Sequence, residues 1–181
     1  ARTIVEPSSD LASRASLTSP GARVVMSRFE DLDVVNKYDS IVMNPPFGSG
    51  GKTAIEHLEK AAKHLKNGGR IVALVPRGGM TDKRLDKWYE DAEGIYLVAR
   101  IDLPTVTFER AGTSVAAQVV ILEKQTDKDV RPAQQINRDY SSAATIKEFF
   151  DRIEEASVPP RTEPKSKDIE VPTDGEVTID G

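Results

Sequence analysis

The sequence predicts a mixed α/β fold, with a mostly parallel sheet whose last strand is antiparallel. Short apolar runs alternate with segments in which apolar residues recur at helical spacing, as in parallel sheets covered by helices. One run, at residues 40–43, ends in Asn44-Pro45-Pro46-Phe47 and is followed by glycines at 48, 50 and 51. Two later runs, at residues 95–103 and 117–122, are close enough in sequence to form an antiparallel pair.

The composition indicates one domain of ordinary size. The chain has 181 residues, enough to bury a sizeable core. It has no cysteine and two histidines, which excludes disulfides and thiolate metal sites, and we expect no metal. No apolar run has the length of a membrane span and the first residues are not a signal peptide, so we expect a cytoplasmic protein without membrane contact.

The charge balance bears on nucleic-acid binding. A net charge of −4 argues against a protein that binds nucleic acid through charge alone. Six acidic residues lie within residues 163–181, so the rest of the chain is closer to neutral. A local basic face is therefore compatible with the composition.

The first strand is predicted at residues 3–5 and ends before Glu6. Ser8, Ser9 or Asp10 can cap the short helix that follows. In nucleoside-binding α/β folds, an acidic residue at the tip of such a strand accepts hydrogen bonds from ribose hydroxyls. Glu6 is our candidate for that contact, with an exposed acid that flanks the helix as the alternative. A second strand is predicted at residues 23–26.

The stretch after residues 40–43 has the chemistry to hold a planar amino group. The two prolines fix φ and remove two backbone donors, so the chain leaves the sheet stiffly at the carboxyl end of the strand, where open α/β sheets bind ligands. Asn44 offers an amide acceptor and donors, and the Pro45 carbonyl is a further acceptor. The Phe47 ring offers a face for stacking a base taken out of its helix. An ordinary turn is the alternative.

Two helices and a strand are predicted next. Apolar residues at helical spacing predict a helix over residues 55–65, with a glycine stop at 67–69. His57 and His64 are expected at the surface or on the flank of this helix. Residues 70–75 read as a buried strand. A helix through residues 85–89 has a basic side formed by Lys83, Arg84 and Lys87, which is either a phosphate contact or a solvated face.

Residues 1–125 are predicted to form the core, and residues 126–181 a helix followed by a linker or tail. Within the second part, apolar residues at 146, 149, 150 and 153 have the spacing of one amphipathic helix. The prolines and charged residues beyond it are typical of a linker.

Asn44-Pro45-Pro46-Phe47 resembles the catalytic motif of the S-adenosylmethionine-dependent amino-methyltransferases. The resemblance covers residues 3–125 and implies a Rossmann-like class I methyltransferase sheet. It also implies S-adenosylmethionine as cofactor and the exocyclic amino group of a base as substrate. Leu103-Pro104, Phe108 and Gly112-Thr113, with an apolar strand ending at Lys124, are similar to the adenine-specific DNA methyltransferases. DNA, methylated at adenine N6, is therefore the expected substrate.

The resemblance also implies roles for individual residues. The catalytic residues are Asn44, Pro45, Pro46 and Phe47, and the residues that bind cofactor are Glu6, Phe29, Glu30 and Asn44. The substrate contacts are Phe47, Phe108 and Arg77. One position departs from the family pattern, because Arg28 lies where an acid that binds the cofactor's adenine is expected.

The family's central first strand is missing from this chain. That strand lies between the strand that ends at Glu6 and the strand that ends at Asn44, and the glycine-rich turn after it holds the methionine part of the cofactor. A parallel sheet cannot leave backbone groups at its centre unpaired. We expect either a longer protein at the amino end or a second chain that supplies the strand.

Two alternatives remain at the level of function. An RNA guanine-N2 methyltransferase shares Asn-Pro-Pro-Phe followed by a glycine-rich loop and a helix. A catalytically inactive relative that serves as a binding module would account for the missing cofactor turn and for Arg28.

Overall fold

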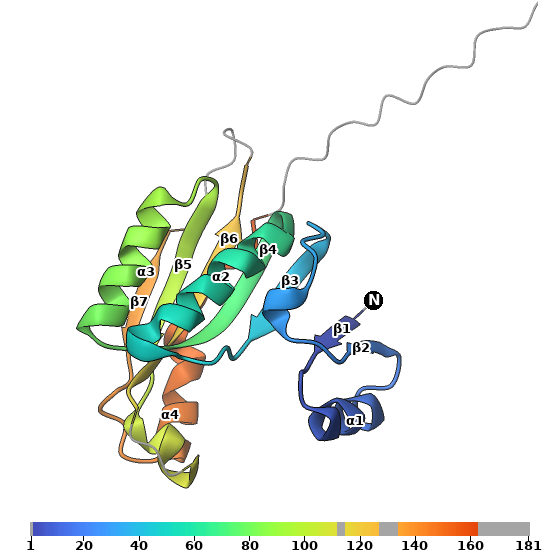
Figure 1. Cartoon of the computed structure of the whole chain (residues 1–181). Helices are drawn as coiled ribbons and strands as arrows, with labels where there is room; N and C mark the ends of the chain where they lie inside the picture. The colour runs from blue at the N-terminus through green and yellow to red at the C-terminus, as the bar shows by residue number, and fades with distance from the viewer. Residues whose placement is uncertain (1, 112–114, 127–133, 163–181) are drawn as a thin grey trace, which may run out of the picture.

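The computed structural model describes residues 2–111, 115–126 and 134–162 of the chain (Figure 1). Residues 112 and 113 of the predicted motif, and the acidic segment 163–181, lie outside the described residues.

A five-stranded mixed sheet forms the centre of the molecule (Figure 1). Its strand order is β3-β4-β6-β5-β7, and its strands are β3 (Tyr38–Met43), β4 (Leu65–Pro76), β5 (Ile95–Asp102), β6 (Ala117–Lys124) and β7 (Ile136–Asp139). β3 pairs parallel with β4, and β7 pairs parallel with β5. β6 lies between β4 and β5 and runs antiparallel to both. The predicted mixed sheet with one antiparallel strand is confirmed.

The first part of the chain forms a separate parallel pair. β1 (Arg2–Val5) and β2 (Ala22–Val25) pair with each other and are joined by helix α1 (Ser9–Thr18). Figure 1 shows this group beside β3, but within the described residues no strand pairing joins β1 to β3. The two sheets are separated at the place where the family resemblance locates a further strand.

Two helices cover one face of the five-stranded sheet and a third covers the other (Figure 1). α2 (Lys52–His64) and α3 (Gly79–Asp91) enclose the first core with apolar residues of β4, β5 and β6. α4 (Ile146–Ile153) places Phe149 in a second core with Val98 and Ile121 on the opposite face. In the part of the chain that the structure describes, no helix has both the length and the apolar character needed to cross a membrane.

Short 3-10 segments connect these elements. They are Phe29–Asp31, Ser49–Gly51, Thr105–Ala111 and Glu154–Ala156. The first two matter for the site, because one follows β2 and the other joins the Asn44 turn to α2.

Both histidines of the chain are buried, so the predicted surface position of His57 and His64 is wrong. Their exposed fractions are 6% and 2%. Both lie on the side of α2 that meets Phe29, whose ring centroid is 5.3 Å from that of His57 and 5.6 Å from that of His64. The segment after β2 covers this side of the helix, which the spacing of the apolar residues in α2 could not reveal.

Strand β7 was not predicted from the sequence. Its four residues, Ile-Asn-Arg-Asp, give one apolar position, and only Ile136 among them is half-buried. It is an edge strand whose place depends on its backbone pairing with β5.

A buried ion pair ties the chain after α4 to the sheet. Glu123 of β6 is fully buried, and one of its carboxylate oxygens lies 2.8 Å from Arg70 Nη2 of β4. Its other oxygen accepts a hydrogen bond from the Thr162 amide at 3.1 Å, and Arg70 Nη1 donates to the Pro159 carbonyl at 2.8 Å. Residues 159–162 are thereby held against the sheet.

The buried Arg70–Glu123 pair predicts that removing one of the two charges destabilises the protein more than removing both. Glu123→Leu leaves the Arg70 guanidinium without its carboxylate, and the free energy of unfolding should fall by about 3–5 kcal/mol. Arg70→Met/Glu123→Leu removes both charges, so it should cost less than the single change. Urea unfolding of the three proteins measures this, and a double variant less stable than Glu123→Leu would contradict the account.

Candidate active site

Asn44 directly follows β3 and is exposed at the carboxyl end of that strand. No hydrogen bond of its side chain occurs among the described residues, so both its donors and its acceptor are available to a ligand. Pro45 is buried and Pro46 is exposed. The turn is therefore anchored in the protein by its first proline while the amide before it faces solvent.

The glycine-rich loop after the prolines is held in one conformation. Gly48, Gly50 and Gly51 have φ values of 66°, 54° and 73°, which side chains disfavour. A Cβ atom at Gly51 would lie 2.5 Å from Thr81 Cγ2 on α3. Arg84 of α3 donates from Nη1 to the Ser49 carbonyl at 2.8 Å and to the Gly50 carbonyl. The loop is thus fixed between the start of α2 and the start of α3.

Phe47 and Phe108 pack against the same core. Both rings are half-buried and contact the apolar cluster on the α4 face of the sheet. The Phe47 carbonyl also accepts a hydrogen bond from the Ala54 amide at 3.4 Å, in the first turn of α2. The two aromatic residues predicted to contact the substrate therefore lie on one side of the sheet.

Glu6 follows β1, and one of its two carboxylate oxygens is hydrogen-bonded within the protein. Its Oε1 accepts a hydrogen bond from the Ser8 amide at 2.8 Å, immediately before α1. The side chain is half-buried, and its Oε2 has no hydrogen bond among the described residues. One carboxylate oxygen is left to accept from a ligand hydroxyl.

Glu30 and Phe29 lie against α2. Glu30 Oε1 is 3.2 Å from Arg28 Nη2 and 3.3 Å from His57 Nε2, although the His57 contact lacks hydrogen-bond geometry. Hydrogen bonding from its own backbone amide, with further contributions from His57 and Arg28, lowers the pKa of Glu30 to about 2. Lys60 of α2 donates to the Glu30 carbonyl. Glu30 is therefore an ionised acceptor, and the Phe29 ring is used in packing against the histidines.

Arg77 lies in a separate polar hollow of about 440 Å³ at the ends of β4, β5 and β6. Its Nη2 is 3.1 Å from Asp102 Oδ2, and the buried Gln118 donates to Asp82 at 2.7 Å. Burial raises the pKa of Asp102, while the neighbouring Arg77 opposes that rise. Asn44 does not line this hollow. The Arg77 charge is thus already compensated within the protein.

The structure brings the predicted site residues to one edge of the sheets but not to one point. Glu6, Asn44 and Arg77 each follow the carboxyl end of a parallel strand. Phe47 and Phe108 join the α4 face, while Phe29 and Glu30 join α2. The edge is where α/β sheets place their ligands.

Similarity to known proteins identifies the family of this chain. Residues 9–99, half of the chain, match the family described as the Methyltransferase small domain. The chain belongs to this family. The match runs from the start of α1 to the middle of β5 and so includes Asn44 and the glycine-rich loop. No curated protein sequence matches the chain.

Solved methyltransferase structures share the fold at low sequence identity. A provisionally assigned class I S-adenosylmethionine-dependent methyltransferase from Listeria monocytogenes superposes with a TM-score of 0.64 at 18% identity, over 85% of this chain and 54% of that one. The modification subunit of a provisionally assigned type I restriction enzyme from Vibrio vulnificus gives 0.55 at 16% identity, over 86% and 40%. A provisionally assigned RNA methyltransferase from Pyrococcus horikoshii gives 0.52 at 14% identity, over 68% and 62%.

The chain spans about half the length of the first methyltransferase and less of the second. These likenesses establish a Rossmann-like class I methyltransferase fold, as predicted.

The residues present fit one part of the S-adenosylmethionine that methyltransferases of this class use. Glu6 has a free carboxylate oxygen and Glu30 is ionised, so both suit the hydroxyl or amino groups of a nucleoside. Within the described residues, no strand with a glycine-rich turn lies between β1 and β3 to carry the methionine part. The nucleoside half of the methyltransferase cofactor thus has candidate ligands in this chain.

Sequence reasoning missed the role of Arg84. Its charge was assigned to a basic side of α3, whereas it binds carbonyls 34 and 35 residues earlier in the chain. The one feature of the sequence that could have indicated these contacts is the glycine run, because glycines have no side chains to cover the neighbouring backbone carbonyls.

The geometry predicts that alanine will destabilise the protein at Gly51 but not at Gly79. Gly51→Ala introduces a side chain at positive φ against Thr81, and should lower the free energy of unfolding by about 1–3 kcal/mol. Gly79→Ala, at the first position of α3, meets no atom within 4 Å and should be neutral or stabilising by up to about 1 kcal/mol. Equal thermal stability of the two variants would contradict the described loop.

His64 predicts a loss of stability in mild acid. Burial, with smaller contributions from Lys60 and Lys37, lowers the pKa of His64 from its ordinary 6.5, and neither ring nitrogen has a hydrogen-bond partner among the described residues. As the pH falls, His64 is therefore protonated in the unfolded chain before it is protonated in the folded one. The stability that neutral His64 contributes is complete above pH 6.5 and is lost as the pH falls below that value.

Urea unfolding at about pH 7.5 and about pH 5.5 measures this contribution. His64→Phe keeps an aromatic ring beside Phe29 and Tyr38 and should lose less stability between the two conditions than the wild type. An identical loss in both proteins would show that His64 does not carry the effect.

Proposed function

We propose that the protein containing this chain transfers a methyl group from S-adenosylmethionine to the N6 amino group of adenine in DNA. The observation that carries the proposal is the exposed Asn44 amide, which has no hydrogen-bond partner among the described residues and lies on a turn fixed by Pro45 and by the Arg84 contacts to the loop. An amide and a neighbouring carbonyl suit an exocyclic amino group, because that group donates two hydrogen bonds in its plane.

The proposed chemistry is mostly positioning. Bound S-adenosylmethionine supplies a methyl group on a sulfonium that can leave as a neutral thioether. Asn44 Oδ1 and the Pro45 carbonyl would accept hydrogen bonds from the two N–H groups of the amino group, which raises the electron density on its nitrogen. The amino nitrogen would bond to the methyl carbon as that carbon leaves the sulfonium sulfur, and the methylated amino group would then release a proton to solvent. Orientation of the nitrogen in line with the methyl group is the main contribution of these residues.

Phe47 is proposed to stack on the adenine after the base leaves the helix, with Phe108 on the opposite side. Unstacking costs a few kcal/mol, which stacking on an aromatic side chain offsets by about 1–3 kcal/mol. Their shared position at the α4 face supports this pairing. Arg77 is proposed to face the substrate backbone from the adjacent hollow, although its pairing with Asp102 reduces its charge.

Glu6 and Glu30 are proposed to hold the nucleoside part of the cofactor, with Phe29 beside it. Within the described residues β1 pairs only with β2, and β3 only with β4. The strand edges left unpaired support a further strand between β1 and β3, from this protein or from a second chain. A partner subunit is compatible with the likeness to a modification subunit of a restriction enzyme, and an RNA substrate with the likeness to an RNA methyltransferase. The Leu103-Pro104 and Phe108 pattern favours DNA.

Removal of the Asn44 amide should abolish most of the activity. Asn44→Ala is expected to lower transfer by about 100-fold or more, as does removal of one preorganised polar group in other active sites. The side chain is exposed, so the melting temperature should be unchanged. Ser49→Ala, a change at an exposed side chain in the same loop, is the matched control. Wild-type turnover of Asn44→Ala would remove the central residue of this proposal.

The substrate can be identified by labelled methyl transfer followed by nucleoside digestion. With S-adenosylmethionine and either DNA or ribosomal RNA, the label should appear as N6-methyladenine from DNA. Label in N2-methylguanine from RNA would establish the alternative substrate instead. Absence of cofactor binding by the full-length protein would favour an inactive binding module.

A further inference from the structure

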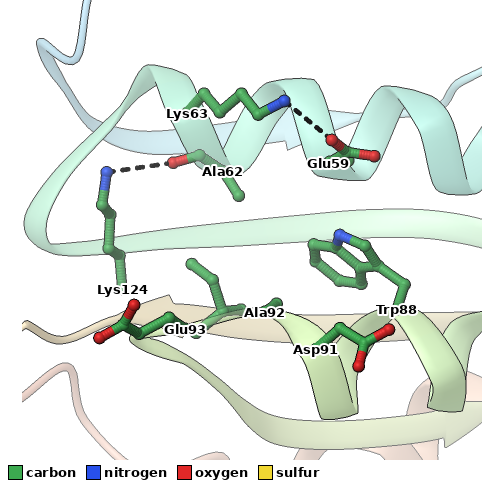
Figure 2. A pocket seen from close by; sticks show the side chains of 9 residues that line it. Glu59, Ala62, Lys63, Trp88, Asp91, Ala92, Glu93 and Lys124 are labelled. Carbon is green, nitrogen blue, oxygen red and sulfur yellow. Dashed lines mark hydrogen bonds and ion pairs between the residues drawn. The ribbon is translucent and has the colours of Figure 1, made fainter.

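A second hollow of about 460 Å³ lies at the opposite end of the sheet from Asn44, between the last turns of α2 and α3 (Figure 2). Trp88 and Ala92 and the buried Ile95 give it an apolar lining. Trp88 is half-buried, and it is the only tryptophan of the chain. The position, at the start of β5 and the end of β6, separates this hollow from the proposed chemistry.

Three carboxylates and two ammonium groups line the hollow, so it has one excess negative charge. Glu59 is paired with Lys63 at 2.8 Å. Figure 2 shows the Lys124 side chain reaching the Ala62 carbonyl at the end of α2, and its ammonium lies 2.9 Å from the Leu65 carbonyl. Burial lowers the pKa of Lys124. Both lysines are thus occupied by groups other than Asp91 and Glu93.

Asp91 and Glu93 are exposed carboxylates without an ion pair or a hydrogen bond from their side chains within the described residues. Asp91 is the last residue of α3, and the last turn of this helix has no basic residue. A helix carries partial negative charge at its carboxyl end, so acids there oppose folding. The last turn of α2, in contrast, has Lys63 and His64. Two acids beside an indole at such a position indicate a cation supplied from outside.

We propose that this hollow binds an arginine side chain of a partner protein, presented on a segment with apolar neighbours. The guanidinium would lie beside the Trp88 ring and within the field of Asp91 and Glu93. Arginine suits this place because its planar cation stacks on aromatic faces and binds carboxylates through two parallel donors. The apolar floor formed by Ala92 and Ile95 accommodates the side chains next to the arginine.

Charge complementarity selects a protein segment over the other candidates. A nucleic acid would bring phosphates against Asp91 and Glu93, which have no ion pair among the described residues, and this contact would be repulsive. A divalent metal would require a closer group of ligands, and no group of three His, Cys, Asp or Glu able to hold a metal occurs among the described residues. A free polyamine would satisfy the charges but would leave the apolar floor uncovered. The surface is therefore a protein docking site at the end of the sheet away from Asn44.

Trp88 allows a direct binding test, because its fluorescence reports this hollow alone. The protein is titrated with acetyl-Leu-Arg-Leu-amide at low ionic strength, and a saturable change in tryptophan emission is expected. Acetyl-Leu-Gln-Leu-amide, which keeps the apolar residues, should bind at least about 10-fold more weakly, and added salt should weaken the arginine peptide as screening predicts. Methyl transfer is not used as a readout, so the result is independent of the proposed activity.

Asp91→Asn/Glu93→Gln should lose at least about 10-fold in affinity for the arginine peptide, and its melting temperature should be unchanged or higher because two acids leave the negative end of α3. Glu56→Gln/Glu90→Gln removes two exposed acids outside the hollow and should bind as the wild type does. Equal binding of the two peptides, equal binding by the two double variants, or no emission change would overturn the proposal. Spermidine binding as tightly as the peptide would replace it with a polyamine site.

Discussion

The stiff turn after β3 is the constraint on which the candidate site depends. Its two prolines supply no backbone donor, so the chain leaves the sheet directly after Asn44. Helix α3 holds the loop that follows, because Arg84 donates to the carbonyls of Ser49 and Gly50. Thr81 packs so closely against Gly51 that a side chain there would not fit. An amide on a turn fixed from both sides loses little freedom when it binds a ligand. That is the condition for positioning a reacting nitrogen.

The molecule separates this edge from the rest of its surface. At the carboxyl ends of the strands lie Asn44, the two phenylalanines and the acids that suit a nucleoside. At the other end, α2 and α3 finish around Trp88 and two carboxylates. The buried pair of Arg70 and Glu123 fastens the chain after α4 to the sheet between these ends. The proposed methyl transfer and the proposed partner binding would thus take place at opposite ends of the same sheet.

Sequence patterns predicted a strand at the position of each of β1 to β6, because each contains a run of apolar residues. They did not predict β7, since Ile136 is its single apolar residue and its place depends on backbone pairing with β5. They also placed the end of α2 and its histidines wrongly. β4 begins at Leu65 and continues through the glycines, and Phe29 covers His57 and His64 from a segment distant in sequence. The Asn44 motif was found because its residues are adjacent in the chain. The contacts of Arg84 with the loop, the pairing of Arg77 with Asp102 and the hydrogen bond of Lys124 to Leu65 join residues far apart in sequence, and no local pattern encodes them.

The proposed contact between the Asn44 amide and the exocyclic amino group of adenine can be observed by heteronuclear NMR. The Asn44 side-chain amide signal is followed while a single-stranded adenine oligonucleotide is added to the protein. We expect this signal to shift with the adenine oligonucleotide and to stay in place when unsubstituted purine, which lacks the amino group, replaces adenine. An equal shift with both oligonucleotides, or no shift when the adenine oligonucleotide is bound, would contradict the proposed contact.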